Sequence, residues 1–297
     1  MMASLLLVLF GLALGSWLNV VTLRYRPERR LFSFHDAAGR SHCLACGREL
    51  RWYELVPLFS FVFQLGRCRS CGVRLSFQYP LVELLGAAIL AGAPRLIAAT
   101  YSVSWGAVEA LAAPAWYYAL SALWIVAAFV WVAIGIVDLR HSIIPNGASV
   151  ALAVLGGGVT VVLAGAALPS FQTSFLGSYA LIAGIPANVF AGHILGAAAG
   201  GLVFWLLWAL SRGRAMGFGD VKLAAASGLL LGWPDIALAV ACSFIVGGVW
   251  GAALLATNRR SMGDRIPFGP FFVVGALLTV VFGRQFLAWY FGIFPGT

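Results

Sequence analysis

The chain has 297 residues, of which 62% are hydrophobic and only 10% are charged, and its mean hydropathy is +0.95. Soluble domains carry roughly 25% charged residues, so this chain has too little charge to cover its surface in water. A helix that crosses a bilayer needs about 20 apolar residues, and several runs here are long enough. The composition therefore predicts an all-α polytopic membrane protein.

The first apolar run covers residues 2–23 and is followed directly by Arg24 and Arg26. A secretory signal peptide carries its positive charge before the apolar stretch, so we expect a retained helix with its N-terminus outside. Seven more helices are expected over residues 79–100, 115–138, 147–167, 188–210, 219–234, 236–257 and 268–292. About eight transmembrane helices result. The expected divisions are 1–23, a cytoplasmic domain over 24–77, a second helix with its outer loop over 78–114, and a core over 115–297.

The basic residues give the orientation. The chain has 19 Lys and Arg against 10 Asp and Glu, a formal net charge of +9. In the eight-helix topology only Arg95 and Arg284 face outside, so the positive-inside rule places residues 24–77 in the cytoplasm. Cytoplasmic loops account for this basic charge, and we expect contact with anionic lipid rather than nucleic acid.

Four of the five cysteines lie in the 24–77 segment, as two C-x-x-C pairs. Each pair is followed by a glycine, and two such turns can close a tetrahedral zinc site. The alternatives are four unrelated thiols or two disulfides, but a reducing cytoplasm disfavours disulfides. Four thiolates leave no open position, so the zinc is expected to be structural. The expected ligands are Cys43, Cys46, Cys68 and Cys71.

Two aspartates lie where expected helices meet the cytoplasmic face. Asp138 ends a long uncharged run, and Asp220 follows Gly217 and Gly219. Asp220 could be a helix N-cap, and Asp138 could mark a helix end paired with Arg140. However, Asp220 begins a run of only about 21 Å, against roughly 30 Å of hydrocarbon. Carboxylates within a membrane are functional candidates.

Two close aspartates favour a definite chemistry. Like charges a few ångströms apart hold one proton between them. The ionised member can take a proton from attacking water, and the protonated member can donate one to the leaving group. Glycines beside Asp220 would let an extended substrate backbone approach. The pattern predicts aspartic peptide hydrolysis.

These motifs resemble the prepilin leader peptidases/N-methyltransferases, which contain the Gly-x-Gly-Asp motif of intramembrane aspartic proteases. The resemblance rests on the ordered motifs Gly15-Ser-Trp-Leu-Asn19, the double C-x-x-C, Trp52-Tyr-Glu54, Gly66-Arg-Cys68, Gln78-Tyr-Pro80-Leu-Val-Glu83, Ile144-Pro145-Asn146 and Gly217-Phe-Gly219-Asp220-Val-Lys222.

The resemblance implies cleavage of basic leaders from type IV prepilins and type II secretion pseudopilins at the cytoplasmic face of the bacterial inner membrane. Asp138 and Asp220 would be catalytic. The supporting peptidase motif would comprise Gly217, Gly219, Lys222, Pro145 and Asn146. It also implies that the new N-terminus is methylated with S-adenosylmethionine.

The methyl-transfer candidates are Asn19, Glu54, Gly66 and Glu83, although an ion pair with a loop arginine would explain Glu83 equally well. The alternatives are a peptidase without methylation, a zinc-module scaffold and a transporter. The sequence gives no oligomeric state and no role for His193.

Overall fold

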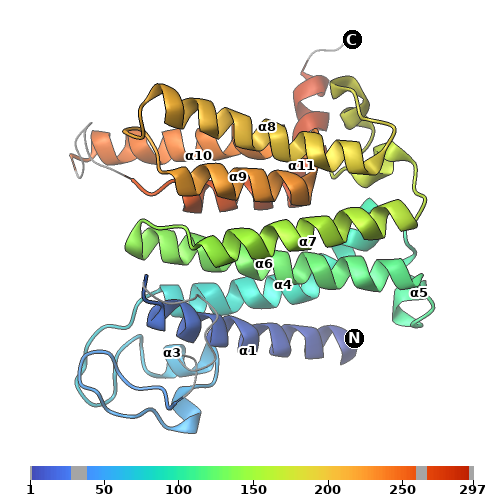
Figure 1. The fold of residues 1–297 in the computed structure, drawn as a ribbon. Coiled ribbons are helices and arrows are strands. Elements are labelled where there is room, and N and C mark those ends of the chain that lie inside the picture. The colour runs from blue at the N-terminus through green and yellow to red at the C-terminus, as the bar shows by residue number, and fades with distance from the viewer. Residues whose placement is uncertain (1, 28–38, 259–265, 294–297) are drawn as a thin grey trace. The chain divides into compact units, whose positions relative to one another are not determined.

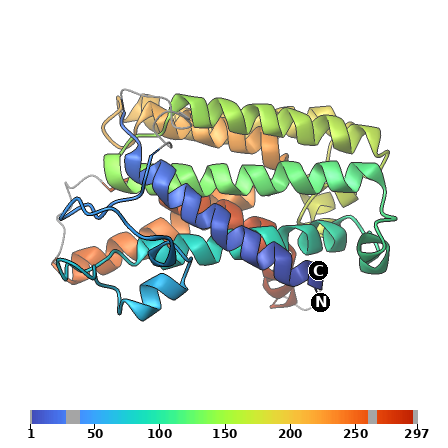
Figure 2. The ribbon, with the colours of Figure 1, turned by 90° about the horizontal axis from the view of Figure 1, so that it is seen from below.

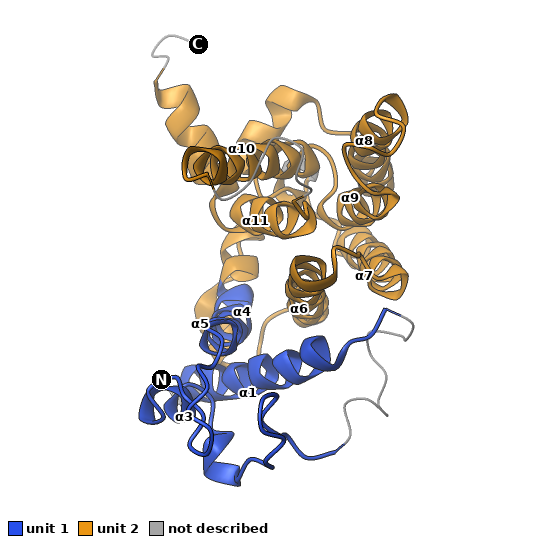
Figure 3. Ribbon diagram, turned by 90° about the vertical axis from the view of Figure 1, so that its left-hand side faces the viewer, with its two compact units in different colours: residues 1–95 blue, residues 96–297 orange. Residues whose placement is uncertain are grey.

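The computed structural model describes residues 2–27, 39–258 and 266–293. These residues form helices and loops, with two isolated β-bridges and no longer strand. The chain divides into two compact units, residues 1–95 and residues 96–297, which Figure 3 shows in blue and orange. Within the described ranges, seven helices are long and apolar enough to cross a membrane. The expected all-α polytopic membrane fold is confirmed.

Unit 1 is built on two long helices, α1 (Met2–Arg24) and most of α4 (Gln78–Thr100), which Figure 2 shows from below. They meet through glycines. A Cβ atom added at Gly15 would lie 2.5 Å from the carbonyl oxygen of Val82. Large apolar side chains gain little by leaving lipid for a helix contact, so small residues that let backbones approach are favoured there.

Between α1 and α4, unit 1 has a polar segment outside the seven candidate spans. Its short helices are η1 (Trp52–Glu54) and α3 (Phe59–Phe63), the second of which is labelled in Figure 1. Its two β-bridges pair His42 with Glu49 and Arg67 with Arg74. His35, the other histidine close to the cysteine pairs in the sequence, lies outside the described residues.

Unit 2 contains the remaining helices, shown in Figure 1. In chain order they are α5 (Trp105–Glu109), α6 (Ala115–His141), α7 (Asn146–Gly165), η2 (Ser170–Thr173), η3 (Gly177–Ala183), α8 (Val189–Leu210), α9 (Phe218–Leu231), α10 (Asp235–Ala256) and α11 (Gly269–Gly292). A helix is present at each of the eight expected positions, because each apolar run is bounded by polar residues, Gly or Pro, but seven of the eight qualify as candidate membrane spans.

Helix α9 lies between α7 and α8, while α6 contacts α7 and α11 (Figure 3). The indole Nε1–H of Trp131 in α6 donates a hydrogen bond to Ser227 Oγ in α9 at 2.9 Å. Both side chains are buried. A satisfied polar pair of this kind fixes the facing of two helices where apolar packing alone would be less specific.

Helix α9 is too short to be one of the seven candidate spans. It has 14 residues, which correspond to about 21 Å at the α-helical rise. This length agrees with the short apolar run expected to begin at Asp220. It packs on α8 through small residues: a Cβ atom added at Gly200 would lie 2.7 Å from the Ala224 carbonyl oxygen, and one at Gly228 would lie 2.2 Å from that of Gly196. The short helix is thus held backbone to backbone by its longer neighbour.

The C-terminal end of α9 has its own partner. Gly232 ends the helix with φ +80°, and His193 Nδ1 of α8 lies 2.8 Å from the Leu229 carbonyl oxygen. With the proton on Nδ1, His193 donates to this carbonyl. The last carbonyls of a helix have no partner within it. His193, for which no role was expected, therefore caps α9.

Candidate active site and metal centre

Asp138 lies in α6, one turn before the helix ends. The helix was expected to stop at Asp138, but it continues to His141 and closes at Ser142, whose left-handed backbone (φ +52°) directs its N–H to the Asp138 carbonyl. The Asp138 carboxylate is only 4% exposed and accepts a hydrogen bond from Gly269 N–H at 2.9 Å. Among the described residues, its partner is therefore the start of α11 and not Arg140.

Asp220 is the third residue of α9, so it is not the N-cap. That position belongs to Gly217, whose N–H donates to Asp220 Oδ2 at 3.2 Å. A carboxylate here satisfies a helix-terminal N–H group and interacts favourably with the helix dipole. Asp220 is 8% exposed. Both aspartates are thus buried carboxylates held by a backbone amide near the start of a helix.

The two carboxylates are near enough for the charge of Asp138 to act on Asp220. They come from different helices, α6 and α9. The loop after α6 closes the arrangement, because a Cβ atom added at Gly219 would lie 3.1 Å from Ile144 Cβ. The structure therefore gathers the end of α6 and the starts of α9 and α11 around a buried acidic pair.

The supporting motif residues lie beside this pair. Pro145 precedes α7, and Asn146 is its first residue. Lys222 Nζ donates to Asn146 Oδ1 at 2.9 Å and lies over the Phe218 ring, 5.2 Å from its centroid. This contact joins the starts of α7 and α9. The ammonium of Lys222 is thereby held by groups other than the two aspartates.

Gly269 is the site residue that the sequence reasoning missed. A Cβ atom at this position would lie 2.7 Å from Asp138 Oδ2, so only glycine leaves room for the carboxylate. The available signal was the Phe268-Gly269-Pro270 string at the start of an apolar run, because proline is favoured in a first helical turn. In a chain with 35 glycines, that signal does not single out Gly269.

A third buried carboxylate in the described part of unit 2, Asp235, was also missed. It is the first residue of α10 and is fully buried. It accepts hydrogen bonds from the Ser174 hydroxyl and from Phe175 N–H. These contacts tie the segment after η2 to α10. Its oxygens are committed to this loop, so its arrangement is structural.

The four cysteines of the polar segment form one cluster. The sulfur atoms of Cys43, Cys46, Cys68 and Cys71 all lie within 4.8 Å of one another. Each pair belongs to a tight turn closed by backbone bonds, in which Gly47 and Gly72 take left-handed backbone angles of +71° and +69°. Tetrahedral zinc with Zn–S bonds of about 2.3 Å requires sulfur atoms about 3.8 Å apart. Cys43 Sγ and Cys71 Sγ are 3.9 Å apart, so the cluster fits a metal.

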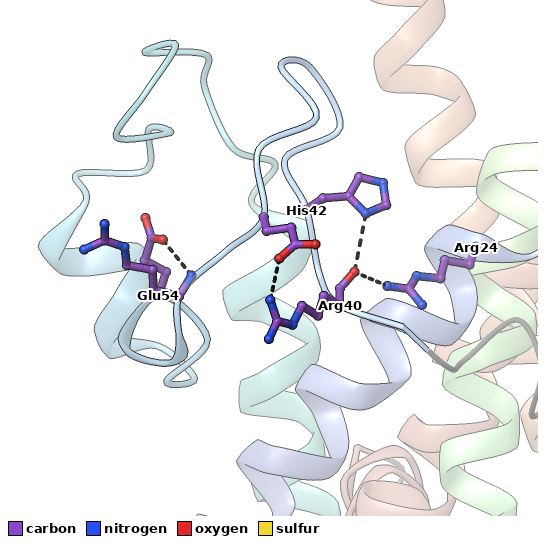
Figure 4. A network of polar contacts seen from close by, with 6 residues as sticks. Arg24, Arg40, His42 and Glu54 are labelled. Atoms are coloured by element: carbon purple, nitrogen blue, oxygen red, sulfur yellow. Dashed lines mark hydrogen bonds and ion pairs between the residues drawn. The ribbon is translucent and has the colours of Figure 1, made fainter.

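The surroundings of Cys68 favour its thiolate form. Backbone N–H groups of Cys71 and Ser70 lower the pKa of Cys68 to about 6. The thiolate is the form that binds a metal. His42 is exposed and its Nδ1 lies 3.5 Å from the Arg40 carbonyl oxygen, to which Arg24 of α1 also donates (Figure 4). His42 is not one of the clustered ligands.

Glu54 is a buried acidic residue of unit 1 that pairs with an arginine. It is 5% exposed and forms an ion pair with Arg48. It also accepts a hydrogen bond from Arg51 N–H, which Figure 4 shows. Burial opposes its ionisation, but these hydrogen bonds prevail and lower the pKa of Glu54. Arg48 follows the first C-x-x-C turn directly, so the pair links that turn to η1.

Glu83 has different partners from those expected. In the described structure it accepts hydrogen bonds from Leu58 N–H at 2.8 Å and from Ser16, not from an arginine. Among residues 2–27, 39–258 and 266–293, no arginine is paired with Glu83, and the ion-pair alternative stays a prediction. Leu58 has φ +61°, an uncommon angle outside glycine, and Glu83 holds its amide. The carboxylate fixes the loop before α3 against α4.

Asn19 and Gly66 order the same region. Asn19 is buried in α1, donates to the Tyr79 carbonyl at 3.1 Å and accepts a hydrogen bond from Gln78 at 3.2 Å. Gly66 has φ +64°, and its carbonyl accepts Leu75 N–H. The four residues singled out for methyl transfer are thus all in unit 1, and the side chains of three of them are engaged in contacts within it.

Comparison with known proteins decides the family. Residues 9–96 match the bacterial peptidase A24 N-terminal domain, and residues 124–252 match the type IV leader peptidase family. A Bacillus subtilis protein named prepilin leader peptidase/N-methyltransferase is 31% identical, with 96% of each chain covered. The chain belongs to the type IV leader peptidase family.

Other relatives carry the same name. The one from Aeromonas salmonicida is 30% identical over 96% of this chain and 92% of the relative, and the one from Pseudomonas aeruginosa is 26% identical over 94% and 90%. No solved structure matches this family member significantly. Its seven long apolar helices make it a multi-pass membrane protein.

Proposed function

We propose that this protein cleaves the leader from type IV prepilins and type II secretion pseudopilins and then methylates the new N-terminus. The family and the names of the relatives support both activities. The proposed location is the bacterial inner membrane, with the site at the cytoplasmic face. The positive-inside distribution of Arg and Lys supports that orientation. A pilin precursor with a basic leader in the cytoplasm and an apolar helix in the bilayer would present its scissile bond there.

The observation that carries the peptidase proposal is the meeting of Asp138 and Asp220. Both carboxylates are buried, both are held by backbone amides, and the charge of one acts on the other. A helix-capping role accounts for one oxygen of Asp220 but not for the burial of a second carboxylate beside it. Burying two like charges close together costs free energy, so such a pair in a membrane protein is a candidate functional site.

In the proposed reaction the pair holds one proton between its two carboxylates. The ionised member takes a proton from water as the water oxygen attacks the scissile carbonyl carbon. The protonated member donates its proton to the developing oxyanion. The tetrahedral intermediate then collapses: the C–N bond breaks, the amine leaves with a proton from the pair, and a hydroxyl of the intermediate returns a proton to the pair as the new carboxyl group forms. Neither a metal nor a covalent intermediate is needed.

The surrounding residues would position these groups. Gly217 and Gly269 donate N–H groups that fix the two carboxylates, and the absence of a side chain at Gly219 lets Ile144 pack against the backbone beside Asp220. The Lys222–Asn146 contact would hold the starts of α7 and α9 together. Pro145 would set the entry of the chain into α7.

The cysteine cluster would hold zinc through Cys43, Cys46, Cys68 and Cys71. Zinc there would supply folding free energy, because four thiolates complete its coordination and leave no position for substrate. The short polar segment contains few buried apolar residues of its own. The metal would therefore maintain unit 1's loops, and the chemistry of cleavage would be independent of it.

For methylation, S-adenosylmethionine would supply an electrophilic methyl group to the free amine that cleavage creates. We place this activity in unit 1, with Asn19, Glu54, Gly66 and Glu83 as its organising residues. Support comes from the match of residues 9–96 to the separate N-terminal domain model. It also comes from the way Glu54 and Glu83 hold the two ends of one loop, at Arg51 and Leu58.

The test uses the purified protein in lipid with a pilin precursor and S-adenosylmethionine, and the product is weighed by mass spectrometry. We expect the wild type to remove the leader and add one methyl group. Asp138→Asn and Asp220→Asn should each leave the precursor intact while remaining folded and metal-loaded. Cleavage by either variant would contradict the dyad. Leader loss without a methyl group would support a peptidase alone, and an intact precursor with wild type would favour a scaffold or a transporter.

A further inference from the structure

The polar segment of unit 1 exposes a group of large apolar side chains outside every candidate span. Trp52 is 79% exposed, Phe63 is 74% exposed and Leu65 is 86% exposed. Isolated exposed apolar residues are ordinary, but a contiguous group marks an interaction site. We call this group the apolar surface. It comprises Trp52, Leu55, Val56, Phe59, Val62, Phe63 and Leu65.

Two contacts fix the apolar surface beside the first turns of α4. Leu58, in its middle, donates its N–H to Glu83, which is the sixth residue of that membrane-spanning helix. Glu83 therefore lies about 7.5 Å along α4 from its first residue. Phe61 of α3 also packs on Phe77, just before α4, with ring centroids 5.5 Å apart. The surface is thus held beside the first turns of α4, which is one of the seven candidate membrane spans.

The exposed charges within residues 50–77 are all positive. Between residues 50 and 77 the only acidic residue is Glu54, and it is buried. The basic residues of this stretch are all exposed, and they are Arg51, Arg67, Arg69 and Arg74. Exposed aromatic and aliphatic side chains flanked by arginines match an anionic membrane surface, which takes apolar groups below its headgroups and attracts basic ones at them.

We infer that the apolar surface is a lipid-binding site that inserts into the headgroup region of an anionic leaflet. The occupant is lipid rather than a protein partner, because the chain itself holds the surface beside a membrane-spanning helix. Trp52 and the Phe residues would sit at the boundary where aromatic rings are favoured. This inference goes beyond the proposed function and does not depend on it, since the test has no activity readout.

The test uses the full-length protein in bilayers that contain a phospholipid with a photoreactive diazirine in its acyl chain. After illumination and trypsin digestion, adducts are mapped by mass spectrometry. Trypsin cuts after arginine, so residues 52–67 would form one peptide. A second peptide, residues 41–48, carries Leu44, which is 69% exposed in the same segment and serves as the matched control. Leu81 on α4 is the positive control for lipid contact.

We expect adducts on residues 52–67 and on α4, and few or none on residues 41–48. Labelling of residues 52–67 should rise severalfold when phosphatidylglycerol replaces phosphatidylcholine, and Phe63→Asp should reduce it more than Leu44→Asp does. Labelled α4 with unlabelled residues 52–67 would overturn the inference. Equal labelling of residues 41–48 would also overturn it. Complete protection by a pilin precursor in the same bilayer would reassign the surface to substrate.

Discussion

At the scale of single residues, the two aspartates are held by main-chain N–H groups rather than by side chains. Asp138 is held by Gly269 N–H and Asp220 by Gly217 N–H. A backbone amide cannot be ionised or rotate away like a side chain. The position of each carboxylate is therefore set by how the starts of α9 and α11 are placed.

Gly269→Ala should impair cleavage strongly. The new methyl carbon would lie 2.7 Å from Asp138 Oδ2, so the carboxylate must shift or the start of α11 must move away. Misplacing a reacting group by about 1 Å can cost about 100-fold in rate, and we expect a loss of that order. The measurement is the initial rate of leader removal. Gly251→Ala, where nothing lies within 4 Å of the added atom, should retain the wild-type rate.

The sequence predicts single residues well where a polar group interrupts an apolar run. Asp138 and Asp220 stand out because a carboxylate that interrupts an apolar run is not expected there without a specific role. The C-x-x-C pairs stand out because their spacing fits one metal. Gly269 does not, because its role exists only once α11 has packed against α6. A contact between distant parts of the chain cannot be recognised from the glycine or from its neighbours in the sequence.

At the scale of helices, α9 is the critical element. It carries Asp220 near its N-terminal end, and its length does not fix its depth in the membrane as a full span would. Its position is set instead by α8, through the Gly196–Gly228 contact, and by the cap from His193 at its C-terminal end. Helices in lipid that pack through glycine are sensitive to added volume because their backbones touch.

Gly228→Ala should displace α9 from α8. The added carbon would lie 2.2 Å from the Gly196 carbonyl oxygen, with no flexible side chain to yield. Overpacking typically costs about 1–3 kcal/mol, so thermal unfolding in detergent should begin at a lower temperature and cleavage should fall. Gly192→Ala, on the neighbouring helix α8, where nothing lies within 4 Å of the added atom, is the control. Equal behaviour of the two variants would show that close α8–α9 packing is unnecessary.

His193→Leu should destabilise α9 by about 1–3 kcal/mol, since it would leave the Leu229 carbonyl buried without its donor. His193→Asn keeps a side-chain N–H at the corresponding distance from the backbone and should recover part of the loss. The comparison of unfolding temperatures for the two variants is the measurement. Identical losses would contradict the capping role, and wild-type stability in both would show that the bond contributes nothing.

Helix ends were predictable to the extent that polar residues bound the apolar runs. The exception at α6 is instructive. The charge at Asp138 and Arg140 predicted an end, yet the helix continues for another turn because Asp138 is buried against α11 and only the residues beyond it reach water. Burial of a charged residue by a distant helix is the information that the local pattern lacks.

At the scale of the whole molecule, the proposed activities fall in different units. Both aspartates lie in unit 2, whereas the cysteine cluster and the methyl-transfer candidates lie in unit 1. Each unit has its own packed helices. The fold class and the motifs of both units could be predicted from the sequence. The close approach of three helix ends in unit 2 could not, because it depends on packing among α6, α9 and α11.

Removing the metal should therefore separate the two activities. Chelation, or Cys43→Ser, should loosen the polar segment, because bound zinc contributes folding free energy directly. We expect faster proteolysis between residues 39 and 77 and loss of methylation, while leader removal retains most of its rate. Cys242→Ser, far along the chain in α10, should change neither the metal content nor the proteolysis pattern. Equal loss of both activities would contradict the division.

The backbone amides that hold the acidic pair also bear on how this protein can be redesigned. Because Gly217 and Gly269 act through main-chain atoms, side chains elsewhere around the site are not needed to aim the carboxylates. A library that varies those neighbours while keeping the two glycines and the two aspartates should yield many folded members with intact carboxylate geometry. Leader preference could then be evolved in the laboratory without rebuilding the catalytic pair.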